Sequence, residues 1–214
     1  MTKILFLPGS GASPEFWKPV GARLPQGWPK EYFGWPGLGD QPHDPAIQGM
    51  DDLVRLVAAR MDEPVDLVAQ SMGGVVATRL ALEQPSLVRR LVLVVTSGGV
   101  NMAGLGAADW RADYRRSFPR AAGWITDTSP SSNLPVERIA APTLLIWGDS
   151  DAISPVAVGQ HLEQRIPDAP DSVLKPFAKE LAKRQVLQSA DALAGQHLQN
   201  PIDQVKLHPA GSDA

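Results

Sequence analysis

The sequence predicts an α/β protein with a doubly wound, mostly parallel β-sheet. Two observations lead to this fold class. Four short apolar runs, each bounded by Gly, Pro, Ser or Asp, have the composition of strands that are buried on both faces. Between them lie segments with apolar residues at three- and four-residue spacing, which is typical of amphipathic helices. Such alternation implies right-handed crossovers between parallel strands.

Each element can be assigned in chain order. The four strongest strand candidates are KILFL (3–7), VDLVA (65–69), RLVLVV (90–95) and TLLIW (143–147). A weaker fifth candidate is KEYFGW (30–35). Helices are expected where apolar residues recur at helical spacing, over 50–61, 75–82 and, more loosely, 156–166.

The interval from Ser97 to Ala141 interrupts this alternation. It is about three times longer than an ordinary connection between a strand and a helix. Its aromatic residues and the arginines interleaved with them are Trp110, Tyr114, Phe118 and Trp124, and Arg111, Arg115, Arg116 and Arg120. The aromatic content predicts an ordered helical insertion at about 98–140, and the arginines are typical of a solvated helix face. We therefore expect one domain, residues 1–214, that carries this insertion.

The composition limits the possible function classes. The length of 214 residues suits one domain with a sizeable core, and 43% hydrophobic and 20% charged residues are ordinary for a soluble protein. The net charge of -3 gives no reason to expect nucleic acid or an anionic membrane as a partner. No cysteine is present and the four histidines are well separated, which argues against thiol chemistry and a zinc site.

Localisation is predicted from the apolar runs. None approaches the roughly 18 residues of a membrane-spanning helix. The apolar part of MTKILFLPG is also too short for a signal peptide. We expect a soluble, cytoplasmic protein that uses no cofactor and binds no membrane.

The candidate nucleophile is Ser71, in the stretch VAQSMGGV (68–75). It lies at the bend between an expected strand and an expected helix. A turn this tight strains the backbone and brings the residues two before and two after the serine together, and here these are the small residues Ala69 and Gly73. The helix N-terminus favours negative charge beside the hydroxyl. This is the nucleophile-elbow pattern G-x-S-x-G with Ala in the first position, although an ordinary turn serine is the alternative.

Several segments in the same order resemble those of the α/β-hydrolase superfamily, over about residues 3–169. FLPGSGASPEFW resembles the family's strand and loop that end in His-Gly, with Pro8 in place of the His. GWPGLGDQP resembles its Pro-Gly-x-Gly-x-Ser loop, with Asp40 where Ser is common. AQSMGG is the elbow, and APTLLIWGDSDAISP resembles the segment that carries the catalytic acid. The resemblance implies a minimal α/β-hydrolase fold, in which the insertion is the cap or lid.

The resemblance also implies an oxyanion hole made of two backbone N–H groups. In the family, one donor belongs to the residue after the nucleophile, which is Met72 in this sequence. The other lies in the first loop and corresponds to Ser10. Because both donate through the backbone, the loss of the usual His should be tolerated. The alternative for residues 8–11 is a plain turn.

The candidate catalytic acids are Asp149 and Asp151, in GDSDAISP. The family spacing of Gly-x-x-Asp, with a Pro four residues later, selects Asp151. Asp149 is then a residue of the turn. A purely structural alternative is that Asp151 or Ser154 caps the helix beginning near Pro155.

The expected base is a histidine that follows the acid in the chain. That order excludes His43, and His161 lies on the helix expected after the acid. His197, in AGQHLQNP, faintly resembles the family ending, and His208 is a second candidate. Residues 170–214 otherwise diverge from the family and contain no convincing last strand. A third possibility is therefore that no histidine completes the triad.

The expected function is a serine hydrolase that cleaves carboxylic esters or related acyl compounds through an acyl-enzyme intermediate. Ser71 attacks the carbonyl of a small-molecule acyl substrate, His197 transfers the proton and Asp151 orients the histidine. The N–H groups of Ser10 and Met72 stabilise the oxyanion. The divergent C-terminal segment suggests the alternative of a catalytically impaired hydrolase-fold protein that binds a small ligand or a protein partner.

Overall fold

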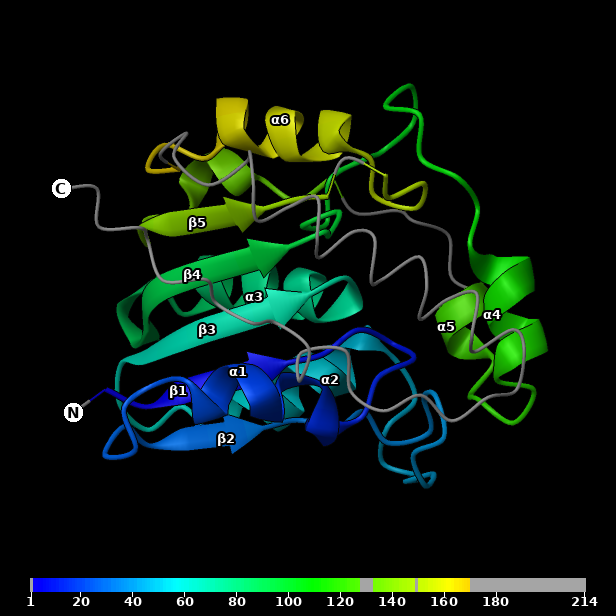
Figure 1. The fold of residues 1–214 in the computed structure, drawn as a ribbon, viewed down its shortest axis with the longest axis horizontal. Coiled ribbons are helices and arrows are strands. Elements are labelled where there is room, and N and C mark those ends of the chain that lie inside the picture. The colour runs from blue at the N-terminus through cyan, green and yellow to red at the C-terminus, as the bar shows by residue number, and fades with distance from the viewer. Residues whose placement is uncertain (1, 128–132, 149, 170–214) are drawn as a thin grey trace, which may run out of the picture.

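A parallel β-sheet forms the centre of the protein (Figure 1). The computed structural model describes residues 2–127, 133–148 and 150–169, and within them the sheet has five strands. The strands are β1 (Ile4–Leu7), β2 (Lys30–Tyr32), β3 (Val65–Gln70), β4 (Val88–Val94) and β5 (Thr143–Ile146). Their order is β2-β1-β3-β4-β5, and every neighbouring pair is parallel. The predicted strands, the weaker one included, are therefore present.

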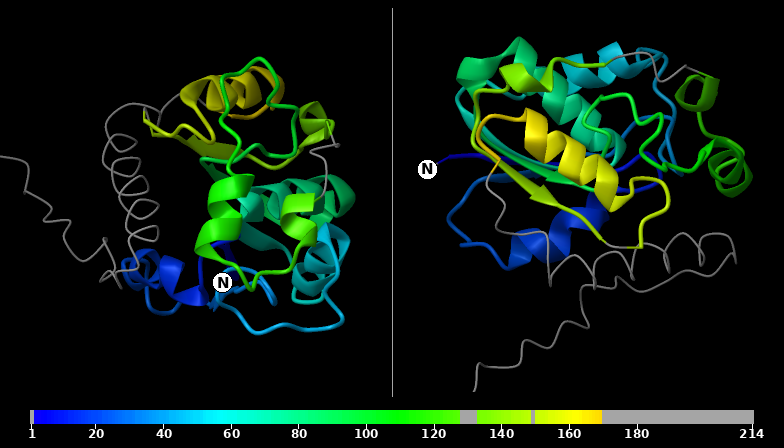
Figure 2. Two further views of the ribbon diagram at one scale, coloured as in Figure 1. Left: turned by 90° about the vertical axis from the view of Figure 1, so that its right-hand side faces the viewer. Right: turned by 90° about the horizontal axis from the view of Figure 1, so that it is seen from above.

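Helices cover both faces of this sheet. Helices α1 (Lys18–Ala22) and α6 (Val156–Arg165) lie on one face, and α2 (Met50–Ala58) and α3 (Met72–Glu83) lie on the other (Figure 2, right). This arrangement confirms the doubly wound fold. The remaining elements are η1 (Pro14–Trp17), η2 (Pro85–Leu87), α4 (Arg111–Ser117), α5 (Trp124–Asp127) and η3 (Val136–Arg138).

The central strands are largely buried because helices cover both faces of the sheet. All four residues of β1 are buried, as strands covered on both faces require. The indole of Trp17 donates a hydrogen bond to the Leu7 carbonyl at 3.1 Å, and that of Trp35 donates to the Pro8 carbonyl at 2.7 Å. Both tryptophans are core residues that also fix the end of β1. Across the described residues, no helix has the length and apolar character needed to cross a membrane.

The interval between β4 and β5 contains α4 and α5, which lie beyond the carboxyl ends of the strands (Figures 1 and 2). Tyr114 of α4 and the residues that cap the helix, Trp110 and Phe118, follow one another at four-residue spacing, and Tyr114 is buried. Three of the arginines form ion pairs with aspartates, namely Arg111–Asp109, Arg115–Asp127 and Arg116–Asp113. Such exposed pairs contribute little stability, as expected for a solvated helix face.

Candidate active site

Ser71 occupies a strained turn between β3 and α3. Its φ of 51° and ψ of −122° lie where non-glycine residues are rare, at a cost of roughly 1–3 kcal/mol. Two backbone bonds hold the turn: the Ser71 N–H donates to the Val94 carbonyl at 3.0 Å, and the Gly74 N–H donates to the Ser71 carbonyl at 2.9 Å. The turn thus has the backbone strain predicted for an elbow.

The structure shows why position 73 of the elbow requires glycine. A Cβ atom on Gly73 would lie 2.5 Å from the Pro8 carbonyl oxygen and 2.6 Å from that of Leu7. Both oxygens belong to the end of β1 and the residue that follows it. Gly73 therefore allows the elbow to approach the loop after β1, which brings two segments of the site together.

Thr96, just after β4, supports the elbow from the other side. Its hydroxyl donates to the Ser71 carbonyl at 2.6 Å and accepts from the Gly98 N–H at 3.0 Å. Val95 precedes it with a φ of 40°, an outlier for a β-branched residue. No sequence pattern points to Thr96, because its partner lies 25 residues earlier.

The last residue of β1 and the loop that follows it, residues 7–12, are together called the first loop below. The buried Gln70 side chain accepts the Gly9 N–H at 2.8 Å. The Gly9 carbonyl in turn accepts the Ala12 N–H at 3.2 Å. Because the C=O and N–H of one trans peptide point in opposite directions, this second bond directs the Ser10 N–H away from the Ala12 turn.

The two predicted oxyanion donors have no acceptor inside the described part of the chain. Neither the Ser10 N–H nor the Met72 N–H takes part in a hydrogen bond there. Met72 is the first residue of α3, where backbone N–H groups lack intrahelical partners. Both groups can therefore donate to a ligand.

Asp151 lies in the loop after β5, residues 147–155, which is called the acid loop below. Its Oδ1 accepts the N–H groups of Ile153 at 2.8 Å and Ser154 at 2.7 Å. Burial raises the pKa of Asp151 above its ordinary value of 3.8, and these two hydrogen bonds partly oppose that change. Asp149 lies outside the described residues.

The structural alternative for the acid loop, a cap on α6, is not observed. Helix α6 has Pro155 as its N-cap and no side-chain cap bond. The Ser154 hydroxyl instead accepts the Trp147 indole N–H at 3.2 Å. Asp151 therefore orders its own loop through Oδ1, and its Oδ2 accepts no hydrogen bond from the described residues.

Sheet topology relates the serine to the acid. Ser71 directly follows β3, and the acid loop follows β5, with β4 between them. Parallel strands end at the same edge, and two strand spacings amount to roughly 10 Å. An imidazole ring that donates a hydrogen bond to the Asp151 carboxylate and accepts one from the Ser71 hydroxyl would fit this distance.

The structure describes two of the four histidines, His43 and His161. The ring Nε2 of His43 lies 2.8 Å from the Arg120 carbonyl oxygen, so it binds the insertion. His161 belongs to α6. The predicted base His197, and the second candidate His208, lie outside the described residues.

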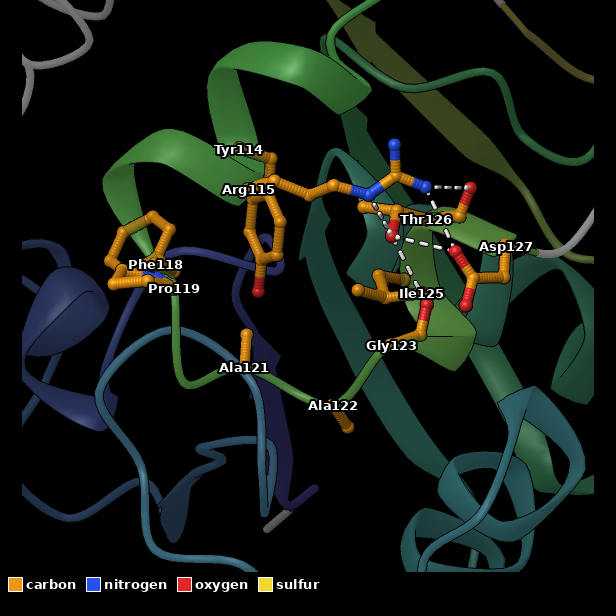
Figure 3. Close-up of a pocket in the computed structure, with 10 residues that line it drawn as sticks. All are labelled: Tyr114, Arg115, Phe118, Pro119, Ala121, Ala122, Gly123, Ile125, Thr126 and Asp127. Atoms are coloured by element: carbon orange, nitrogen blue, oxygen red, sulfur yellow. Dashed lines mark hydrogen bonds and ion pairs between the residues drawn. The ribbon is translucent and has the colours of Figure 1, made fainter.

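A hollow of about 320 Å³ lies between α4 and α5 (Figure 3). Arg115 crosses it to bond the Thr126 hydroxyl at 3.0 Å and the Asp127 carboxylate at 2.8 Å. Neither Ser71 nor Asp151 lines it. Its lining residues are Tyr114, Arg115, Phe118, Pro119, Ala121, Ala122, Gly123, Ile125, Thr126 and Asp127. The hollow therefore belongs to the insertion and is separate from the elbow and the acid loop.

Sequence comparison places these features in a family. The family model described as "Alpha/beta hydrolase family" matches residues 4–205 of the chain. The chain belongs to the α/β-hydrolase family. This match continues past residue 169, where the motif resemblance ends. It includes His197 and stops before His208.

Curated relatives of this α/β hydrolase include esterases. The pimeloyl-[acyl-carrier protein] methyl ester esterase of Neisseria meningitidis serogroup C is 26% identical over 208 residues, which cover 77% of this chain and 81% of the relative. An enzyme of the same name from Cronobacter sakazakii is 33% identical over 94 residues, covering 44% of this chain and 36% of the relative.

Solved structures share the fold. A putative lipase from Acinetobacter baumannii superposes with a TM-score of 0.66 at 18% identity, covering 91% of this chain and 85% of that one. The putative non-heme bromoperoxidase BpoC from Mycobacterium tuberculosis gives a TM-score of 0.65 at 20% identity, covering 90% and 93%. These likenesses confirm the predicted α/β-hydrolase fold.

Proposed function

We propose that this α/β hydrolase is a carboxylic ester hydrolase in which Ser71 is the nucleophile. The observation that carries the proposal is the strained backbone of Ser71, at the end of β3 and the start of α3. Such strain persists only where the surroundings enforce it, and it presents the side chain beyond the strand ends. The names of the curated relatives support ester hydrolysis as the reaction.

The proposed mechanism proceeds through an acyl-enzyme. The base removes the Ser71 hydroxyl proton as Oγ attacks the ester carbonyl carbon, and the carbonyl oxygen becomes negative. The N–H groups of Ser10 and Met72 bind this oxyanion. The protonated base then gives its proton to the leaving alcohol. Water, activated by the same base, releases the acid and restores Ser71, and no cofactor takes part.

We assign the base to His197 and its orientation to Asp151. The inclusion of His197 in the family match supports this choice over His208. Asp151 lies in a partly buried loop, and no donor in the described part of the chain bonds its Oδ2, which suits a carboxylate that holds an imidazole in one tautomer. The ring then relays protons between Ser71 and the leaving group.

The proposed substrates are small esters, and the relatives suggest where to begin. Their printed name specifies a methyl ester of an acyl group carried by a protein. We propose methyl esters of carboxylic acids as the first substrate class to assay for this chain, beside a short p-nitrophenyl ester.

Labelling with a fluorophosphonate tests the nucleophile. The wild-type protein should be labelled and should hydrolyse the p-nitrophenyl ester, and Ser71→Ala should lose labelling and about 10⁵-fold or more of kcat. Ser86→Ala is the matched control, because the exposed Ser86 lies in η2, at the opposite edge of the sheet. Wild-type protein that is neither labelled nor active would falsify the proposed function.

Two histidine variants test the base. His197→Ala should lower kcat by about 10³-fold or more, whereas His208→Ala should retain wild-type turnover. The reverse result would move the assignment to His208. Undiminished turnover in both variants would show that neither histidine is the base.

A further inference from the structure

The Tyr114 hydroxyl joins three segments that are far apart in the sequence. It donates to the Ser10 carbonyl at 3.0 Å and accepts the Gly39 N–H at 2.9 Å. These partners lie 104 and 75 residues away. One hydroxyl proton and one lone pair serve the two bonds. The insertion is therefore bonded directly to the loop that carries a predicted oxyanion donor.

The neighbours of Tyr114 hold its ring in place. The Trp110 ring packs edge-on against it with 5.5 Å between ring centroids, and the Phe118 ring packs against it with 5.0 Å between centroids. The Phe118 ring also lies over Gly11, where a Cβ atom would come within 2.8 Å of it. Helix α4 thus contacts two consecutive residues of the first loop, Ser10 by a hydrogen bond and Gly11 by packing.

The first loop needs such external contacts because glycines flank Ser10. Gly9 and Gly11 have wide conformational freedom, so the turn bond from the Ala12 N–H to the Gly9 carbonyl needs support from outside the loop to hold the direction of the Ser10 N–H. Gln70 holds the Gly9 N–H on one side, and Tyr114 holds the Ser10 carbonyl on the other. The peptide unit that contains the Ser10 N–H lies between these two anchors.

We propose that Tyr114 is a positioning residue, which orients the Ser10 N–H toward the oxyanion and makes that orientation depend on the insertion. The inference rests on the proposed function, because it concerns the oxyanion formed by attack of Ser71. A backbone donor stabilises the transition state only when it is preorganised. Loss of the Tyr114 anchor should therefore weaken transition-state binding and leave ground-state binding of the ester nearly unchanged.

The test is Tyr114→Phe, with Tyr32→Phe as the matched control. Tyr32 is the other tyrosine of the chain, and its ring stacks on Phe6 in the sheet at 4.9 Å. Tyr114→Phe removes one oxygen atom and keeps the ring packing. We expect kcat on a p-nitrophenyl ester to fall about tenfold with KM unchanged, which is a fraction of the effect of deleting an oxyanion donor. Tyr32→Phe should keep the wild-type kcat.

Inhibition by a trifluoromethyl ketone separates a positioning role from a purely structural one. Attack of the serine on this ketone creates an oxyanion, so its Ki should rise in Tyr114→Phe by the same factor by which kcat falls. Equal losses in both tyrosine variants, or wild-type kcat and Ki in Tyr114→Phe, would overturn the inference.

Gln70→Leu is the second variant, in case Tyr114→Phe does not fold. It removes the acceptor of the Gly9 N–H and should give the same fall in kcat and rise in Ki. Unchanged values there would also contradict the inference. Failure of the inference is distinguishable from failure of the proposed function, because the latter abolishes fluorophosphonate labelling and turnover in the wild-type protein.

Discussion

The first loop and the acid loop both follow strands of the same sheet, yet they are built in different ways. The first loop is held by side chains from distant segments: Trp17 and Trp35, Gln70 and Tyr114. The acid loop is ordered mainly by its own residues, through the bonds of Asp151 to Ile153 and Ser154 and of Trp147 to Ser154. A change in the first loop should therefore disturb folding and activity together, whereas a change in the acid loop can separate them.

Of the changes in these two loops, Asp151→Asn in the acid loop should have the largest effect on activity. Asparagine keeps an oxygen that can accept the N–H groups of Ile153 and Ser154. It cannot hold the base in the required tautomer, and a comparable change in serine proteases lowers kcat by about 10⁴-fold. Steady-state kinetics measure this loss. Activity within tenfold of the wild type would show that Asp151 is not the acid.

The same variant separates activity from stability as the pH changes. Burial raises the pKa of Asp151 in the folded protein above 3.8, so the ionised carboxylate disfavours folding. This penalty is absent below pH 3.8, where both states are protonated, and it grows as the pH rises through the folded-state pKa. In urea unfolding, Asp151→Asn should match the wild type at low pH and be the more stable protein at neutral pH.

The next largest effect is expected from a change that disturbs the packing of the elbow against the first loop. In Gly73→Ala, the Cβ atom would meet the Leu7 and Pro8 carbonyl oxygens, which cannot move without distorting β1. We expect a loss of about 3 kcal/mol in the free energy of unfolding, together with most of the ester turnover. Gly49→Ala is the matched control, since its φ is −177° and no atom lies within 4 Å of the added Cβ. Equal stability of the two variants would contradict the close approach.

This difference explains which features were predictable from the sequence. The strands and the tight turn at Ser71 are predictable from short motifs, because strand burial and tight turns depend on neighbouring residues. Asp151 is selected by its resemblance to the family's acid segment, and its role stays a prediction. Gln70, Thr96 and Tyr114 were missed, because their partners lie 61, 25 and 104 residues away and a single polar residue carries no signal of its partner. The contact of Gly73 with the end of β1 likewise has no signal in the sequence, because the two segments are far apart in the chain.

A smaller effect is expected from Thr96→Val, which tests the support of the elbow from β4. Valine keeps the shape of Thr96 but loses the bonds to the Ser71 carbonyl and the Gly98 N–H. We expect a loss of about 1–2 kcal/mol in the free energy of unfolding, because Thr96 is buried. Urea denaturation measures it. Thr143→Val is the matched control, since its buried hydroxyl bonds only the nearby Ala141 carbonyl and lies at the amino end of β5. Only Thr96→Val should also reduce the rate of fluorophosphonate labelling.

The smallest effect should be a gain in stability, in Ser71→Gly. The φ of 51° at Ser71 is accessible to glycine without strain, so the substitution relieves roughly 1–3 kcal/mol. Glycine also increases the entropy of the unfolded chain, which offsets about 0.5–1 kcal/mol of that gain. The variant should therefore lose activity, yet its free energy of unfolding should be about 1 kcal/mol higher than that of the wild type. Ser86→Gly, in an exposed turn of η2, should lose stability, because no strain is relieved there. If both variants lose equally, the elbow stores no strain, and the surrounding contacts merely accommodate its conformation.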